Sequence, residues 1–377
     1  MPVWDRFRPS FASAARSDVI CPYCLERLGK KFLIRVCPVC GAEAPCTGRV
    51  EKCSNPGCSG SFTRLKCGYE SCGALLPAGL LEYDKYLRFS MIGTIGSGKT
   101  SFLTAMLHEL RNAENSPWVL SHMDGMTDRT FQRNDGLMFH QNKTVDSTPP
   151  GISPRPQLWQ VRDLDKQTDT RIPSYSVTIY DGAGEDFEKE IDPVISRYVA
   201  GSKVLVILID PLTLSEAVSE VPEEIREWSS TAEHTGGAPT AMVDNLANYI
   251  RACCGISVDR KIDRDVAIVF TKIDIVEGEF RAGVTMQPSP HLEKRGFDLA
   301  DADAVDQEIQ DWLAAKHQSA FLKAIDANFV NGRVRFFGVS NFGKPPVGPY
   351  RLGTVTPHRV LDPLVWMLYK EGIVPAV

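Results

Sequence analysis

The chain has 377 residues, of which 43% are hydrophobic, and a formal net charge of −5 at pH 7. This length and apolar content suffice to bury a full α/β core and leave room for a smaller module, so we expect two domains. The acidic balance argues against a nucleic-acid partner, and no apolar run approaches the length of a membrane span.

Residues 1–17 are expected to form an N-terminal tail. They lack the apolar stretch of a signal peptide, so we expect a cytoplasmic protein. In a reducing compartment the eleven cysteines are unsuited to disulfides, and their spacing is interpreted first as metal chemistry.

Nine of the eleven cysteines precede residue 93, and eight of them form pairs: Cys21/Cys24, Cys37/Cys40, Cys53/Cys58 and Cys67/Cys72. Residues 18–82 are therefore predicted to form a double zinc ribbon with two structural Cys₄ sites. The spacing favours sequential sites, the first two pairs holding one Zn²⁺ and the last two the other. An interleaved arrangement, first with third and second with fourth, stays open. Cys46 is left over, and Cys253 and Cys254 are expected to be buried in a helix.

The charge of the N-terminal part bears on what the zinc ribbon binds. Residues 1–89 carry 13 basic and 8 acidic side chains, and eight thiolates with two Zn²⁺ would bring their net charge of +5 close to neutral. A neutral surface is a poor match for a phosphate backbone. We expect the ribbon either to dock protein partners or to brace the neighbouring domain.

A phosphate-binding pattern, GxxxxGK[ST], is matched by residues 93–100, which read GTIGSGKT. A strand predicted over 87–92 and a helix predicted over 101–110 give the motif the context that it requires. Backbone N–H groups and the positive end of the helix would face the phosphates, Lys99 would reach the β- and γ-phosphates, and Thr100 would bind Mg²⁺. The residues expected to hold the nucleotide here are Gly93, Gly96, Ser97, Gly98, Lys99, Thr100 and Ser101.

Further strands are predicted over 176–181, 203–210, 265–270 and 333–339. Continuous apolar runs of this kind predict strands covered on both faces, and thus an α/β fold with a doubly wound, mostly parallel sheet. The stretches near 214–239 and 276–332 are expected to be insertions. Helical patterns are predicted over 305–329 and 358–369.

A second motif, TKID at residues 271–274, fits the guanine-reading pattern [NT]KxD. With the phosphate loop, this order of motifs resembles the small Ras-like GTPases of the P-loop TRAFAC class, over residues 86–377. The resemblance implies that DGAG at 181–184 is the D-x-x-G motif, in which Asp181 holds Mg²⁺ through water and Gly184 binds the γ-phosphate. It also implies that Asp274 accepts hydrogen bonds from guanine while the Lys272 stem lies along the base. The remaining base-site residues would be Thr271, Ser340 and Asn341.

Two departures from the family pattern concern hydrolysis. Glu185 stands where many members have the glutamine that orients water, and Ile95 would crowd an arginine entering from a partner. We therefore expect slow intrinsic turnover, with Lys99, Gly184 and Glu185 as the catalytic residues. Thr148 is the expected switch threonine that binds Mg²⁺, and Thr144 is the alternative.

A zinc module fused ahead of a GTPase with insertions resembles the double-GTPase families of bacterial conflict and signalling systems. That resemblance implies a GTP/GDP-dependent switch that acts on partner proteins, which could be a second GTPase or an effector. The alternatives are a zinc-ribbon adaptor with a non-cycling structural nucleotide, and an ATP-driven machine, which would need a site tolerant of either purine.

Overall fold

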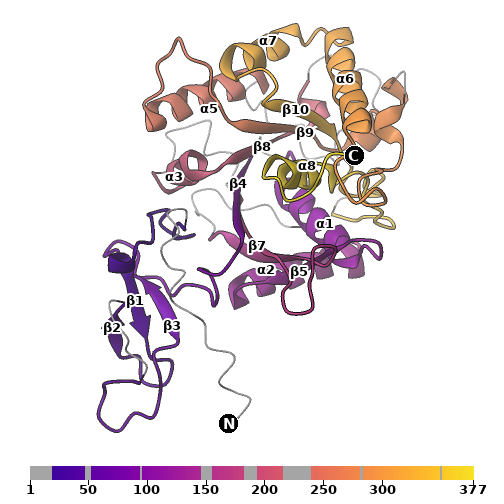
Figure 1. Cartoon of the computed structure of the whole chain (residues 1–377). Coiled ribbons are helices and arrows are strands. Elements are labelled where there is room, and N and C mark those ends of the chain that lie inside the picture. Colours follow the sequence, from indigo (N-terminus) through magenta and orange to yellow (C-terminus); the bar gives the residue numbers. More distant parts are fainter. Residues whose placement is uncertain are drawn as a thin grey trace.

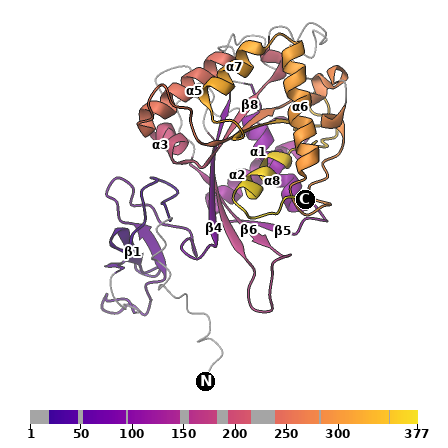
Figure 2. The same cartoon turned by 45° about the horizontal axis from the view of Figure 1, so that its top comes forward.

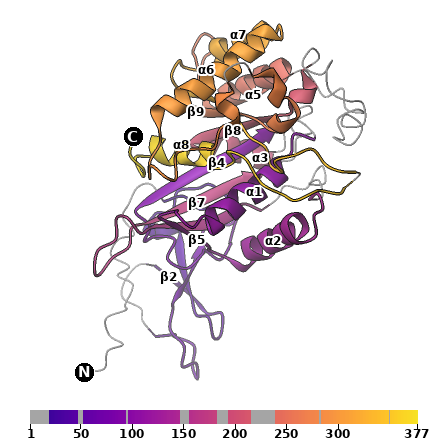
Figure 3. The same ribbon diagram turned by 90° about the vertical axis from the view of Figure 1, so that its right-hand side faces the viewer.

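The computed structural model describes residues 19–46, 52–93, 96–145, 155–181, 193–214, 239–280, 283–348 and 350–377. Within these residues the strands form two separate sheets, one of three strands and one of seven. Figure 1 shows the small sheet and its loops beside the larger body, and Figure 3 shows the same arrangement from the side. We call residues 19–82 the cysteine-rich module and residues 85–377 the α/β domain.

The small sheet of the cysteine-rich module is built around β1 (Leu33–Val36). This strand pairs antiparallel with β2 (Glu43–Pro45) on one side and with β3 (Arg64–Cys67) on the other. A 3₁₀ turn, η3 (Lys30–Phe32), leads into β1. The apolar core is small and includes cysteine side chains, so the module depends on more than hydrophobic burial for its stability.

The large sheet of the α/β domain has the strand order β10-β9-β8-β4-β7-β6-β5. Strands β4, β7, β8, β9 and β10 are parallel, whereas β6 and β5 run antiparallel at one edge. The strands are β4 (Lys85–Gly93), β5 (Trp118–His122), β6 (Gln157–Asp163), β7 (Ser174–Asp181), β8 (Val204–Ile209), β9 (Asp265–Phe270) and β10 (Val334–Gly338).

Helices cover both faces of this sheet (Figure 2). One hydrophobic core joins the sheet to α1, α2 and α8, and a second joins its other face to α3, α5 and α7, with α6 beside β10. The helices are α1 (Lys99–Asn112), α2 (Gly125–Asp135), α3 (Pro193–Gly201), α5 (Pro239–Cys254), α6 (Leu299–Ala315), α7 (Ser319–Asn328) and α8 (Asp362–Lys370). Single turns are η4 (Gly136–His140), η6 (Pro211–Thr213), η7 (Ile273–Ile275), η8 (Glu277–Glu279) and η9 (Val284–Met286). Among these described helices, none is both long and apolar enough to span a bilayer.

The predicted α/β fold with a mostly parallel sheet is confirmed. All six residues of β8 are buried, as expected for a strand covered on both faces. The chain winds from β4 toward β7 on one side and toward β8 on the other, so the order of strands reverses at β4. In open α/β sheets, ligands bind at the carboxyl ends of the strands at such a reversal point.

Three local predictions need correction. The helical pattern over 305–329 is two helices, α6 and α7, separated by a turn at His317 with a positive φ of 57°. The closing helix begins at Asp362 rather than at residue 358. Cys253 and Cys254, expected to be buried, are exposed because they occupy the last turn of α5, just before Gly255.

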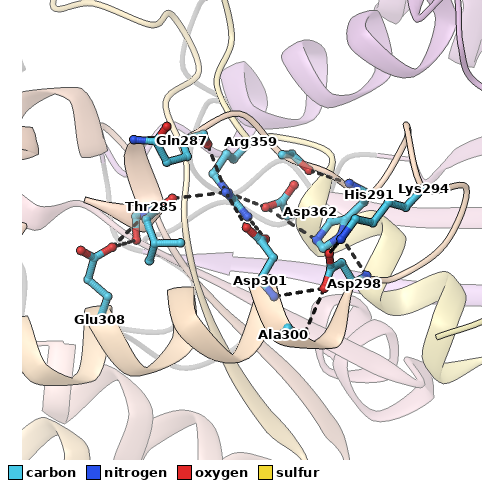
Figure 4. Close-up of polar contacts among 12 residues, drawn as sticks. Thr285, Gln287, His291, Lys294, Asp298, Ala300, Asp301, Glu308, Arg359 and Asp362 are labelled. Atoms are coloured by element: carbon cyan, nitrogen blue, oxygen red, sulfur yellow. Dashed lines mark hydrogen bonds and ion pairs between the residues drawn. The ribbon is translucent and has the colours of Figure 1, made fainter. Parts of the chain in front are cut away.

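A buried ion-pair network fastens α6 to the start of α8 (Figure 4). The Arg359 side chain is 1% exposed; its Nε donates to Asp362 at 2.7 Å and its Nη2 donates to Asp301. The Asp301 and Asp362 carboxylates also lie near His291, with one metal-ligating atom of each residue within 4.8 Å of the others. The Arg359 guanidinium already bridges the two carboxylates, and burial lowers the pKa of His291, so we interpret the cluster as structural.

The same region supports the loop that contains Ser340. The backbones of Ser340 and His358 exchange two hydrogen bonds, at 3.0 and 2.8 Å. The His358 ring lies 2.8 Å from the Thr285 carbonyl, and the Thr285 N–H and hydroxyl both donate to Glu308 (Figure 4). Contacts from residues 284–308 therefore support this loop through His358.

Replacing Arg359 by methionine should be strongly destabilising. Asp301 and Asp362 would remain buried without their cation, so we expect the free energy of unfolding to fall by about 3–5 kcal/mol in urea titrations. Arg295→Met is the matched control. Both arginines have a positive φ, but the ion pair between Arg295 and Asp165 is exposed. The control should lose less than about 1 kcal/mol. Equal losses in both variants would contradict this role for Arg359.

Candidate functional site

The described part of the turn between β4 and α1 contains two glycines with positive φ. Gly96 and Gly98 have φ of +76° and +77°, values that favour glycine. A Cβ on Gly93 would lie 2.5 Å from the Leu208 carbonyl oxygen, so no larger residue fits there. Thr94 and Ile95 lie outside the described residues.

Helix α1 begins at the end of this turn, so the positive end of its dipole faces the loop. Its first three residues are Lys99, Thr100 and Ser101, whose backbone N–H groups lie in the unsatisfied first turn of the helix. Lys99 Nζ donates to the Gly93 carbonyl at 3.0 Å, which holds the ammonium group over the loop. The arrangement suits an anion of phosphate size.

Asp181 at the end of β7 meets this helix start. The Thr100 hydroxyl donates to Asp181 Oδ2 at 3.2 Å, so two residues 81 positions apart share one polar contact. The other oxygen, Asp181 Oδ1, is buried and accepts no hydrogen bond from the described part of the chain. Burial raises the pKa of Asp181, and Lys99 and the Thr100 hydrogen bond oppose that rise. A hydroxyl and a carboxylate with an unused oxygen are oxygen ligands that fit Mg²⁺ or its water shell.

Three predicted site residues, Thr148, Gly184 and Glu185, lie outside the described residues. The alternative switch residue, Thr144, is described, and its N–H donates to the Tyr350 carbonyl at 3.3 Å. The roles of these four residues stay predictions.

The predicted base-reading motif lies directly against the phosphate loop. The buried Thr271 hydroxyl donates to the Ser97 carbonyl at 2.8 Å and is 3.2 Å from that of Ile209. The Asn341 side-chain amide donates to the Gly98 carbonyl at 3.3 Å. Two segments about 170 and 240 residues downstream are thus tied to neighbouring peptide groups of one loop.

Asp210 is a site residue that sequence reasoning missed. It follows β8, is completely buried, and accepts a hydrogen bond from Lys272 Nζ at 2.5 Å through Oδ2 and from the Leu212 N–H at 2.9 Å through Oδ1. Lys272 has a strained backbone conformation with φ +55°. Its hydrogen bond to Asp210 fixes the direction of the Lys272 side chain. The available signal was a lone carboxylate at the end of a wholly apolar strand.

The loop at Ser340 and Asn341 closes the other side of the same region. The Ser340 hydroxyl accepts from the Gly343 N–H at 2.7 Å, which forms a tight turn. Asn341 Oδ1 is buried and has no hydrogen-bond donor among the described residues. Asp274 is half-buried on η7, which lies beside this loop because the Ile273 N–H donates to the Val339 carbonyl at 3.1 Å.

The eight paired cysteines of the cysteine-rich module form two groups of four. The proximal group, which contacts the α/β domain, is Cys21, Cys24, Cys67 and Cys72, and the distal group is Cys37, Cys40, Cys53 and Cys58. Both predicted arrangements, sequential and interleaved, are wrong, because the first pair joins the fourth and the second joins the third. The reason is strand pairing: β1 places Leu33 opposite Cys67 at one end and leads to Cys37 at the other, so each end of the strand carries one group.

The sulfur positions fit a tetrahedral metal. Sulfur–sulfur distances are 3.8 and 3.7 Å in the proximal group and 3.8 and 3.4 Å in the distal group. A tetrahedral Zn²⁺ with Zn–S bonds of about 2.3 Å separates its sulfurs by about 3.8 Å. Burial raises the pKa of Cys67, and a cation bound to its sulfur would favour the thiolate. With four cysteines in each group, neither site keeps an open position for catalysis.

No protein-family model matches the chain, and no curated protein does. Among solved structures, the chain is similar to the S. cerevisiae Ski7 GTPase-like domain bound to GDP and inorganic phosphate, with 12% identity and a TM-score of 0.37 over 77% of this chain and 51% of that one. The GTP-bound form of that domain gives a TM-score of 0.33 with the same identity and coverage. Sup35 complexed with GDP gives 11% identity and 0.27 over 68% of this chain and 37% of that one. The chain spans about half the length of these structures or less, and scores this low do not establish a shared fold.

The nested pairing of the cysteines can be tested with Cys67→Ser. We expect the purified variant to lose one of two zinc ions, because an incomplete proximal group binds metal weakly. Iodoacetamide labelling read by peptide mass spectrometry should then modify Cys21, Cys24 and Cys72 and spare the distal group. The matched control is Cys46→Ser, which should change neither zinc content nor labelling. New labelling at Cys53 and Cys58 would instead support sequential sites.

Proposed function

We propose that the chain binds GTP and GDP with Mg²⁺ and hydrolyses GTP slowly, as a molecular switch that acts on partner proteins. The hydrogen bond from Thr271 to Ser97 carries the proposal, because it sets the predicted base-reading motif beside the predicted phosphate loop. In this proposal one nucleotide extends from the start of α1 to Asp274.

In this proposal the chain's own residues divide into three tasks. Backbone N–H groups at the start of α1 and the Lys99 ammonium hold the phosphates. Thr100 and Asp181 hold Mg²⁺, which supplies charge neutralisation of the phosphates when it is bound. Asp274 accepts from the two donors on the edge of guanine, and adenine lacks that pair of donors.

The zinc ribbons are proposed to recognise the partner proteins or to brace the α/β domain. A near-neutral module favours protein partners over nucleic acid. Val39, between two distal cysteines, is 69% exposed and offers an apolar contact. The sequence resembles double-GTPase families of bacterial conflict systems. That resemblance suggests a second GTPase as one such partner.

Base selection can be tested with Asp274→Asn. An amide donor would face the guanine donors, so we expect the affinity for GTP to fall roughly 10- to 100-fold and the preference to move toward xanthosine triphosphate. Equilibrium titration with labelled nucleotides measures both. Asp326→Asn is the control, because Asp326 forms an exposed ion pair with Lys261 and should bind GTP as the wild type does. Unchanged GTP affinity in the Asp274 variant would refute the guanine assignment.

Hydrolysis is expected to be slow without a partner, because Glu185 replaces the glutamine that would orient water. Single-turnover phosphate release should be near the unassisted Ras-like range of about 10⁻⁴–10⁻³ s⁻¹. Lys99→Ala provides the background rate from any contaminating enzyme. A rate well above this range would contradict the expectation, and retained GTP with no phosphate release would favour the adaptor with a structural nucleotide.

A further inference from the structure

The zinc knuckle between Cys21 and Cys24 lies against the part of the α/β domain that leads to Asp181. The Tyr180 hydroxyl, at the end of β7, donates to the Pro22 carbonyl at 3.2 Å. The Tyr198 hydroxyl, on α3, donates to the Tyr23 carbonyl at 3.3 Å. The two tyrosine rings stack with centroids 4.1 Å apart, so they form one unit beneath the knuckle.

This contact is buried and closely fitted. Tyr180 is 3% exposed and Tyr198 is 8% exposed. A Cβ on Gly201, at the end of α3, would lie 3.1 Å from the Leu25 side chain just past the knuckle. The Tyr23 hydroxyl also donates to Asp124 at 3.3 Å, and Asp124 caps the start of α2. The knuckle thus contacts β7, α3 and the start of α2.

This contact connects the proximal cysteine group to the proposed Mg²⁺ site, because residues on both sides of it are neighbours in the chain of Cys21, Cys24 and Asp181. Pro22 and Tyr23 lie between two ligands of the proximal group, so a metal that fixes the sulfurs also fixes the two carbonyls. Tyr180 immediately precedes Asp181, and the hydrogen bond that holds its side chain restrains the end of β7. The helix α3 is tied to the central strand in turn, because Ser202 and Ser90 share a hydrogen bond of 2.7 Å.

We propose that Tyr180 and Tyr198 are positioning residues through which the proximal metal site sets the place of Asp181. This inference rests on the proposed function, since Asp181 acts there as the Mg²⁺ carboxylate. Zinc at the proximal group and Mg²⁺·nucleotide at the phosphate loop then stabilise each other, because coupling between two binding sites is reciprocal. The distal group makes none of these contacts among the described residues and is not coupled.

The first test is the Mg²⁺ dependence of GDP affinity in Tyr180→Phe, which removes one hydroxyl and keeps the stacked ring. We expect affinity for labelled GDP at saturating Mg²⁺ to fall about fivefold, the loss of one hydrogen bond, with no change when Mg²⁺ is omitted. Tyr69→Phe is the matched control, because the Tyr69 hydroxyl donates to the Arg27 carbonyl within the same module. It should match the wild type at both Mg²⁺ levels. Equal behaviour of the two variants would overturn the proposal.

The second test uses the wild-type chain and therefore does not depend on the folding of a variant. Zinc release to a colorimetric chelator should show two ions, and saturating Mg²⁺·GDP should slow the release of one of them. Release of both ions unaffected by bound nucleotide would overturn the inference while leaving the proposed function intact. Failure of the wild-type chain to bind GDP, seen directly in the titration, would refute the proposed function and the inference with it.

Discussion

The hydrogen bond between the Thr271 hydroxyl and the Ser97 carbonyl is the contact on which the candidate site depends. It joins the loop after β4 to the end of β9, although β8 separates these two strands in the sheet. The Asn341 side chain, after β10, donates a second hydrogen bond to the same loop. Parallel strands make this possible, because their carboxyl ends all meet at one edge. The glycine turn, the start of α1, Thr271 and Asn341 therefore lie together at this edge.

The grouping of the cysteines in the cysteine-rich module also follows from strand pairing. One short strand, β1, holds a cysteine group at each end, and its antiparallel neighbours bring the partner cysteines to the correct end. A core this small would be stabilised by a metal held in these two groups. The Cys21–Cys24 knuckle accepts hydrogen bonds from two stacked tyrosines beside Asp181, so a candidate metal site and a candidate magnesium site lie on either side of one contact.

The sequence was sufficient to predict the mostly parallel sheet, the strand–loop–helix context of the phosphate loop and the membership of the two cysteine clusters in one module. Local patterns carry these features: apolar runs predict strands, glycines predict the turn, and cysteine pairs separated by two or four residues predict knuckles. Cysteine pairing could not be predicted, because it depends on which strands lie together. The roles of Asp210 and of the Arg359 network could not be predicted for a similar reason, because each depends on partners distant in the chain. The exposure of Cys253 and Cys254 was mispredicted because they lie in the last turn of α5, which the apolar pattern did not locate.

The most direct measurement is equilibrium binding of fluorescently labelled GDP and ADP to the zinc-loaded wild-type chain in Mg²⁺. If the α1 start holds the phosphates and Asp274 selects the base, GDP should bind at one site per chain and ADP should bind far more weakly. Equal affinity for the two nucleotides, or no binding of either, would contradict a guanine-nucleotide site at this edge of the sheet.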